Sequence, residues 1–174
     1  MKRVLVVSDE ADAEASAVCP ALSALGYLVT FAGIGRPSDM IAVLSGEVCP
    51  DADYTVICAH GDEGTFILPE LAEEVYYPDE PHKLSADSIG DFVKLTGKTV
   101  ISTACTTGNE DLAKAFTSKG NSYIAPSDYV EGSAALYFVL SLFYHLAKPG
   151  TTVQDAFGKA AAADEETALF RLFE

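Results

Sequence analysis

The stretch Val100–Cys105, which reads Val-Ile-Ser-Thr-Ala-Cys, decides the fold class of this chain. It begins with β-branched apolar residues, as a buried strand does, and ends on a small residue followed by a cysteine. A second stretch of the same kind, Val56–Gly61, reads Val-Ile-Cys-Ala-His-Gly. Segments with helical periodicity lie between such runs. Strands that alternate with helices favour an α/β fold with a mainly parallel sheet.

The expected elements alternate along the whole chain. Strands are expected at Val4–Val7, which should be buried, and at Tyr27–Ala32, Tyr54–Ala59, Thr99–Thr103 and Ser122–Ala125, with one arm of a hairpin at Thr65–Leu68. Helices are expected at Asp12–Leu25, from Ser38 as cap to Leu44, from Ser85 or Asp87 as cap to Leu95, and at Glu110–Lys119, Ser133–Lys148 and Thr151–Ala163. The helix Ser133–Lys148 is apolar nearly all round, which predicts burial. Residues 69–83 are rich in proline and acids, which predicts an irregular, mobile loop that borders the substrate groove.

Composition and charge exclude several classes of function. The chain has 174 residues, 49% of them hydrophobic, which fits one domain over residues 1–174. Its 26 acidic and 11 basic residues give a net charge of −15. Such a chain lacks the basic surface that binds nucleic acid or anionic lipid, and it attracts basic partners. No signal peptide or membrane span is expected, and four cysteines without a C-x-x-C pair indicate a reduced, cytoplasmic protein.

Residues that could catalyse a reaction lie at the ends of two strands. In a parallel sheet the active residues gather at the carboxyl ends of the strands, where His60 and Cys105 are expected. If these strands are neighbours, the two side chains form a Cys/His dyad. The Cys105 thiolate is then the nucleophile, favoured by the helix that follows it, and His60 is the general base and acid. The N–H groups of Gly61 and Cys105 would bind an oxyanion.

Other interpretations compete with the dyad. A cysteine in an apolar chain is usually a small buried residue, which is how Cys19, Cys49 and Cys58 are interpreted. A zinc site from Cys58, His60 and Cys105 is conceivable, although Cys58 is better explained as core. A magnesium-binding receiver would need a third acid where His60 stands, beside Asp9 and Glu10. The stretch Gly33–Ser38 half-matches a dinucleotide loop but contains a proline, and the chain has no G-x-S-x-G motif.

Several short motifs, in order, resemble the caspase-like cysteine peptidases of clan CD, and within them the bacterial CHAT branch related to separase. The resemblance runs from Tyr54 to about Ala163. It rests on Ala59–Gly61, Leu84–Ile89, Val100–Gly108, Leu112–Phe116, Gly120–Ala125, Phe143–Leu146 and Thr151–Ala156. The order and spacing of these pieces are more specific than any one of them.

The resemblance implies a three-layer caspase-like sandwich, with a mainly parallel sheet flanked by helices. It implies peptide-bond hydrolysis by His60 and Cys105 through an acyl-enzyme thioester, with Gly61 at the oxyanion hole and without metal or organic cofactor. The Q-A-C-x-G string of caspases is absent, so specificity for aspartate is not indicated. The family often has a tryptophan after the fifth strand, about where Asp128 stands. It is often fused to helical repeats, so two alternatives stay open for this chain: it acts alone, or a separate protein activates it or presents its substrate.

Acidic residues near the active edge suggest a specificity. Asp9, Asp62, Asp128 and Glu131 are all expected there, and one buried carboxylate would favour arginine or lysine before the scissile bond of a protein or peptide substrate. Asp128 and Glu131 are preferred, since they follow the fifth strand; the alternative is that these acids belong to a solvated surface. A second function stays open, a non-catalytic caspase-like interaction module, against which the intact pair of His60 and Cys105 argues.

Overall fold

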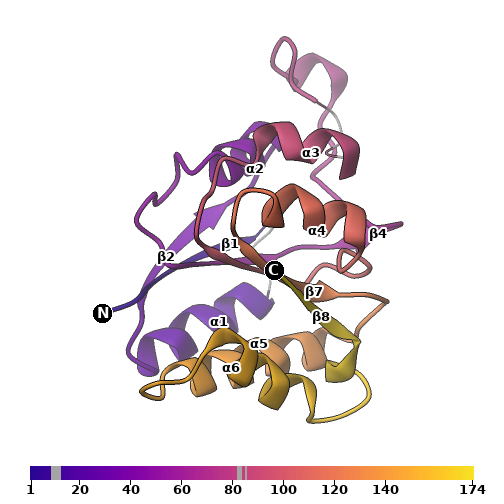
Figure 1. Cartoon of the computed structure of the whole chain (residues 1–174). Helices are drawn as coiled ribbons and strands as arrows, with labels where there is room; N and C mark the ends of the chain where they lie inside the picture. The colour runs from indigo at the N-terminus through magenta and orange to yellow at the C-terminus, as the bar shows by residue number, and fades with distance from the viewer. Residues whose placement is uncertain (9–12, 82–83, 85) are drawn as a thin grey trace.

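A mainly parallel sheet forms the middle of the molecule (Figure 1). The structure, a computed structural model, describes residues 1–8, 13–81, 84 and 86–174. Six strands pair in the order β2-β1-β3-β6-β7-β8. They are β1 (Arg3–Ser8), β2 (Leu28–Gly33), β3 (Tyr54–Cys58), β6 (Thr99–Ser102), β7 (Ser122–Pro126) and β8 (Phe170–Phe173). All pair in parallel except β8, which runs antiparallel to β7.

Helices cover both faces of this sheet. In Figure 1, α2, α3 and α4 lie above it, and α1, α5 and α6 lie below. Their bounds are α1 (Ala13–Ala24), α2 (Pro37–Leu44), α3 (Ala86–Phe92), α4 (Glu110–Thr117), α5 (Gly132–Leu146) and α6 (Val153–Ala161). A short hairpin of β4 (Gly61–Asp62) and β5 (Thr65–Phe66) follows β3, and 3-10 turns lie at Glu73–Val75 and Thr167–Leu169. The predicted three-layer α/β sandwich is confirmed.

The core consists of two apolar layers, one on each face of the sheet. Alternate residues of one strand serve both layers: Leu5 and Val7 pack toward α2, α3 and α4, and Val4 and Val6 toward α1, α5 and α6. Side chains of a strand alternate between the faces of a sheet, so a strand buried on both faces must be apolar throughout. This is why the short apolar runs in the sequence are good predictors of these strands.

Most expected elements are confirmed to within a few residues, and the differences have local causes. Helix α3 ends at Phe92 instead of Leu95, because the backbone N–H groups of Lys94 and Leu95 donate to the carbonyl of Leu44. Helix α5 is not buried all round, since Tyr137 and Tyr144 are more than half exposed. Ser38 is not a cap, because Arg36 occupies that position and Pro37 begins the helix.

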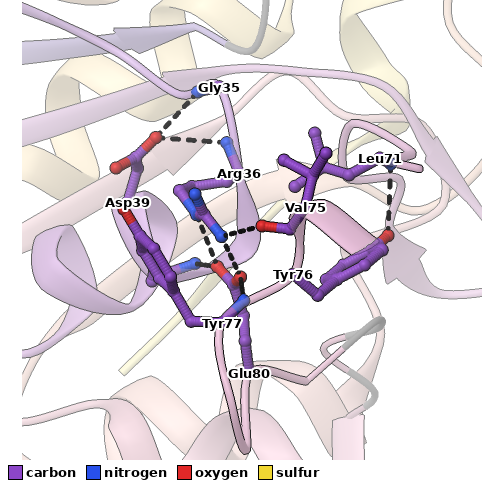
Figure 2. Close-up of polar contacts among 9 residues, drawn as sticks. Gly35, Arg36, Asp39, Leu71, Val75, Tyr76, Tyr77 and Glu80 are labelled. Atoms are coloured by element: carbon purple, nitrogen blue, oxygen red, sulfur yellow. Dashed lines mark hydrogen bonds and ion pairs between the residues drawn. The ribbon is translucent and has the colours of Figure 1, made fainter. Parts of the chain in front are cut away.

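In the loop predicted at residues 69–83, the described part is irregular but is attached to the residues before α2 (Figure 2). The Arg36 guanidinium forms two hydrogen bonds to the Glu80 carboxylate, at 3.0 and 2.6 Å, and a third to the carbonyl of Val75. It also lies 3.4 Å from the centroid of the Tyr77 ring. The Glu80 side chain is only 2% exposed. A two-pronged ion pair with a stacked ring restricts motion, so these contacts oppose the predicted mobility.

Candidate active site

The carboxyl ends of β3 and β6 meet at one edge of the sheet. The two strands are hydrogen-bonded neighbours, with Ile57 opposite Ser102. His60 and Cys105 follow them and line one pocket of about 410 Å³. The pocket is lined by Ala13, Glu14, Ala59, His60, Thr103, Cys105, Val130, Gly132, Ser133, Ala135 and Leu136. The adjacency of strands that a Cys/His dyad requires is therefore present.

The Cys105 thiol lies against the backbone of Val130. The Val130 N–H donates to Sγ at 3.5 Å, and Sγ lies 3.7 Å from the Val130 carbonyl oxygen, to which the thiol can donate. Val130 stands two residues before α5. The sequence argument expected the helix after Cys105, which is α4, to favour the thiolate, whereas the backbone group at the sulfur belongs to the segment that leads into α5.

The loop that carries Cys105 is fixed from both neighbouring strands. Thr106 adopts a left-handed backbone with φ of 62°, a conformation that is costly for a β-branched residue. Its hydroxyl accepts a hydrogen bond from Gly64 N–H at 2.9 Å, and its own N–H donates to the carbonyl of Asp128 at 3.2 Å. The Asn109 amide adds a hydrogen bond to the carbonyl of Gly64. Contacts to the segments after β3 and β7 thus hold the strained residue in place.

Gly61 lets the histidine segment approach the cysteine loop. A Cβ at this position would lie 2.2 Å from the Cys105 carbonyl oxygen, far inside van der Waals contact. Gly108, on the other side of the loop, is equally constrained, since its Cβ would lie 2.4 Å from the carbonyl oxygen of Ala125. Both glycines are required by close packing of backbones. The Cys105 loop is therefore closely packed between the backbone of the Gly61 segment and the backbone at Ala125.

Three of the acids expected at the active edge, Asp62, Asp128 and Glu131, are not among the residues that line the pocket. The Asp62 carboxylate accepts hydrogen bonds from its neighbour Glu63 N–H and from the Tyr129 hydroxyl. The Asp128 carboxylate accepts from Tyr129 N–H at 2.7 Å. Glu131 is the exposed residue at the start of α5. A preference for basic residues set in this pocket by Asp62, Asp128 or Glu131 is therefore unsupported. Asp9 lies outside the described residues.

The acid that does line the pocket is Glu14. It stands in the first turn of α1, and its Oε2 accepts a hydrogen bond from the Thr103 hydroxyl at 3.1 Å. Thr103 directly follows β6, so Glu14 is held from the strand that leads to Cys105. Glu14 was not selected from the sequence, because it lies in the helix after the first strand and not at the end of the strand itself.

The remaining candidates lie elsewhere. Cys58 is fully buried in the core, as expected from the sequence, whereas Cys19 and Cys49 are only partly buried. Within the part of the chain that the structure describes, no three histidine, cysteine or acidic side chains are grouped as metal ligands would be. Among those residues, too, no helix has the length and apolar character to cross a bilayer. The described part of the loop at residues 69–83 contributes nothing to the lining of the pocket. Glu10 lies outside the described residues.

Comparison with known proteins places the fold. No protein-family model matches the sequence, and no curated protein matches it. Among solved structures, the chain is similar to one in a complex of the RgpB pro- and mature domains from Porphyromonas gingivalis, with a TM-score of 0.58 and 11% identity. That match covers 95% of this chain and 44% of the RgpB chain. A crystal structure of drICE matches with a TM-score of 0.53 and 17% identity, over 99% of this chain and 86% of that one. At such identities the likeness concerns the fold alone, and it does not single out the CHAT branch. The chain has a caspase-like fold.

Proposed function

We propose that this chain is a cysteine endopeptidase that uses His60 and Cys105. The observation that supports this most is that both residues line one pocket at the carboxyl edge of a caspase-like sheet. A pocket that holds a thiol and an imidazole is suited to acyl transfer, because the imidazole can accept the thiol proton and later return it. The likeness of this fold to the RgpB and drICE chains is further support for the peptidase proposal.

The reaction follows from these residues. The Cys105 sulfur attacks the carbonyl carbon of the scissile peptide bond as His60 takes up the thiol proton. The N–H groups of Gly61 and Cys105 stabilise the oxyanion. His60 then gives its proton to the leaving amine, the C–N bond breaks, and a thioester remains. Water attacks the thioester with His60 as general base, which releases the carboxylic acid and restores the thiol. No metal or organic cofactor takes part in this proposal.

The proposed preference is for arginine or lysine before the scissile bond, and Glu14 is the carboxylate that supports it. The pocket wall contains the apolar side chains of Val130, Ala135 and Leu136, against which the methylene stem of a long basic side chain can pack. A guanidinium at the end of that stem would form charge-assisted hydrogen bonds with Glu14. Glu14→Gln keeps the shape and removes the charge, so it should lower kcat/KM for arginine substrates at least tenfold more than for uncharged ones.

Further parts of the proposal concern the setting of the enzyme. We propose one domain over residues 1–174, a cytoplasmic location, and relationship to the CHAT branch, on the motifs and charge given above. The chain would act on protein substrates, alone or with a separate activating protein. A net charge of −15 favours basic substrate segments and basic partners.

The test is the rate at which iodoacetamide alkylates Cys105 between pH 5 and 9, resolved by mass spectrometry, in the wild type and in His60→Ala. Cys49 serves as a partly exposed reference and Cys58 as a buried one. We expect Cys105 to react at lower pH than Cys49 and to lose that advantage without His60. A peptide-library screen then reports cleavage after basic residues. If Cys105 behaves like Cys49 in both proteins and no peptide is cleaved, the fold serves as a binding module and the peptidase proposal is wrong.

A further inference from the structure

We propose that the hydrogen bond between Tyr129 and Asp62 is a positioning bridge that holds the Val130 backbone against the Cys105 thiol. The inference rests on the proposed function only in taking Cys105 to be the nucleophile. The Tyr129 hydroxyl donates to the Asp62 carboxylate across 67 positions of sequence. Asp62 belongs to the hairpin after β3, and Tyr129 follows β7.

The bridge joins the two segments that lie on either side of the cysteine loop. The sheet order places β6 between β3 and β7, so the loop after β6 lies between the segments that carry Asp62 and Tyr129. Three successive residues of the segment after β7 are tied down. The carbonyl of Asp128 accepts from Thr106 N–H, the hydroxyl of Tyr129 donates to Asp62, and Val130 N–H donates to the sulfur.

Burial does not hold the Tyr129 ring in place. The side chain is 62% exposed, so an apolar pocket does not fix its position, and the hydrogen bond to Asp62 is the contact that does. The pKa of the phenol is raised by this hydrogen bond and by the nearby charges of Asp62 and Glu63. The hydroxyl therefore stays protonated, and able to donate, throughout the neutral range.

The Val130 backbone can serve both protonation states of the sulfur. Its N–H stabilises the thiolate, because a hydrogen bond to the charged form favours that form. Its carbonyl can accept the proton of the neutral thiol. A small displacement of Val130 changes the balance between these contacts, and it also moves one wall of the pocket. Tyr129 and Asp62 thus act on the nucleophile through Val130 and are positioning residues.

The test compares Tyr129→Phe with Tyr144→Phe, a matched loss of a hydroxyl from a tyrosine that is 52% exposed near the far end of α5. The readout is the pH profile of Cys105 alkylation. The N–H contact to sulfur is one ordinary hydrogen bond, so we expect Tyr129→Phe to slow alkylation below pH 8 by about threefold to tenfold. Tyr144→Phe should leave the profile unchanged, and thermal unfolding should show both variants folded.

Asp62 variants separate a bridge from a charge effect. Asp62→Ala should reproduce the Tyr129→Phe profile, and the double variant should lose no more than either single one, because both remove one contact. Asp62→Asn keeps an acceptor oxygen and should retain most of the reactivity. The bridge is ruled out if Tyr129→Phe matches the wild type, if the two effects multiply, or if Asp62→Asn is as slow as Asp62→Ala. The peptidase proposal fails separately, when His60→Ala changes nothing.

Discussion

Gly61→Ala is the substitution whose effect the structure determines most directly. The added Cβ would lie 2.2 Å from the Cys105 carbonyl oxygen and 3.1 Å from the carbonyl carbon of Ala104. Both atoms are backbone, so no side-chain rotation can relieve the contact. Ordinary van der Waals contact begins at 3.4 Å, so the two backbones must separate by 1.2 Å, the difference from 2.2 Å, to restore it.

Two measurable losses follow from that separation. Overpacking of a close contact costs about 1–3 kcal/mol of unfolding free energy. For a chain of this length each kcal/mol lowers Tm by about 2–4 °C, so we expect a decrease of about 2–12 °C. The same shift moves Cys105 relative to His60, and a displacement of about 1 Å at a reacting group lowers the rate on the order of 100-fold. The reactivity of Cys105 that depends on His60 should therefore fall on the order of 100-fold while the protein stays folded.

The assays are thermal unfolding followed by circular dichroism, and Cys105 alkylation at pH 7. Gly158→Ala is the control, because it lies in α6 and no heavy atom stands within 4 Å of the added Cβ. It should raise stability by about 0.5–1 kcal/mol, since alanine is the better helix former. Gly108→Ala should destabilise as Gly61→Ala does, because its Cβ meets backbone at 2.4 Å. A Gly61→Ala protein with wild-type Tm and wild-type Cys105 reactivity would refute the close approach on which this reasoning depends.

Three further predictions concern stability. Burial raises the pKa of Tyr27 to about 12, so the unfolded chain ionises first. The unfolding free energy should fall as the pH rises from about 10 to 12, and urea titrations of Tyr27→Phe should lack that part of the decrease. Asn121 donates its buried side-chain N–H groups to the carbonyls of Leu95 and Phe116; Asn121→Asp leaves both without this donor and buries a carboxylate, which should cost about 2–4 kcal/mol by calorimetry. The hydrogen bonds from Arg36 lower the pKa of Glu80 from the ordinary 4.5. The ion pair between Arg36 and Glu80 therefore stabilises the loop fully above that pH, and its contribution decreases as the pH falls below it. At pH 7, Glu80→Gln should make residues 71–80 several times more susceptible to limited proteolysis.

Four strands of the central sheet could be predicted from the sequence because they are buried on both faces, whereas the predicted edge strand β2 is largely exposed. Such strands are short apolar runs, and β1, β3, β6 and β7 all have that form. The edge strand β8 was missed because Phe170–Phe173 contains Arg171 and is only partly buried. Its pairing with β7 depends on contacts far away in sequence, from Tyr123 to Phe173. The local sequence pattern gives no indication of that pairing.

The candidate site, too, contains residues that could be predicted from the sequence and residues that could not. The positions of His60 and Cys105 followed from one general rule, that parallel strands end at one edge. The same rule could not predict which acid lines the pocket, because that depends on the path of each loop after its strand. Asp128 follows the correct strand, yet its carboxylate bonds to the next backbone N–H. Glu14 follows the first strand at a greater distance in sequence and reaches the pocket from α1.

The cysteine loop is constrained on two sides, and this determines what can tune its reactivity. On one side the Gly61 backbone packs against the Cys105 carbonyl, and on the other Gly108 packs against Ala125. A loop wedged in this way cannot adjust by itself, so changes in the thiol environment must come from the segments around it. In the segment after β7, the exposed side chain of Tyr129 is held by its hydrogen bond to Asp62. Loss of this hydrogen bond would therefore affect Cys105 although neither Tyr129 nor Asp62 lines the pocket.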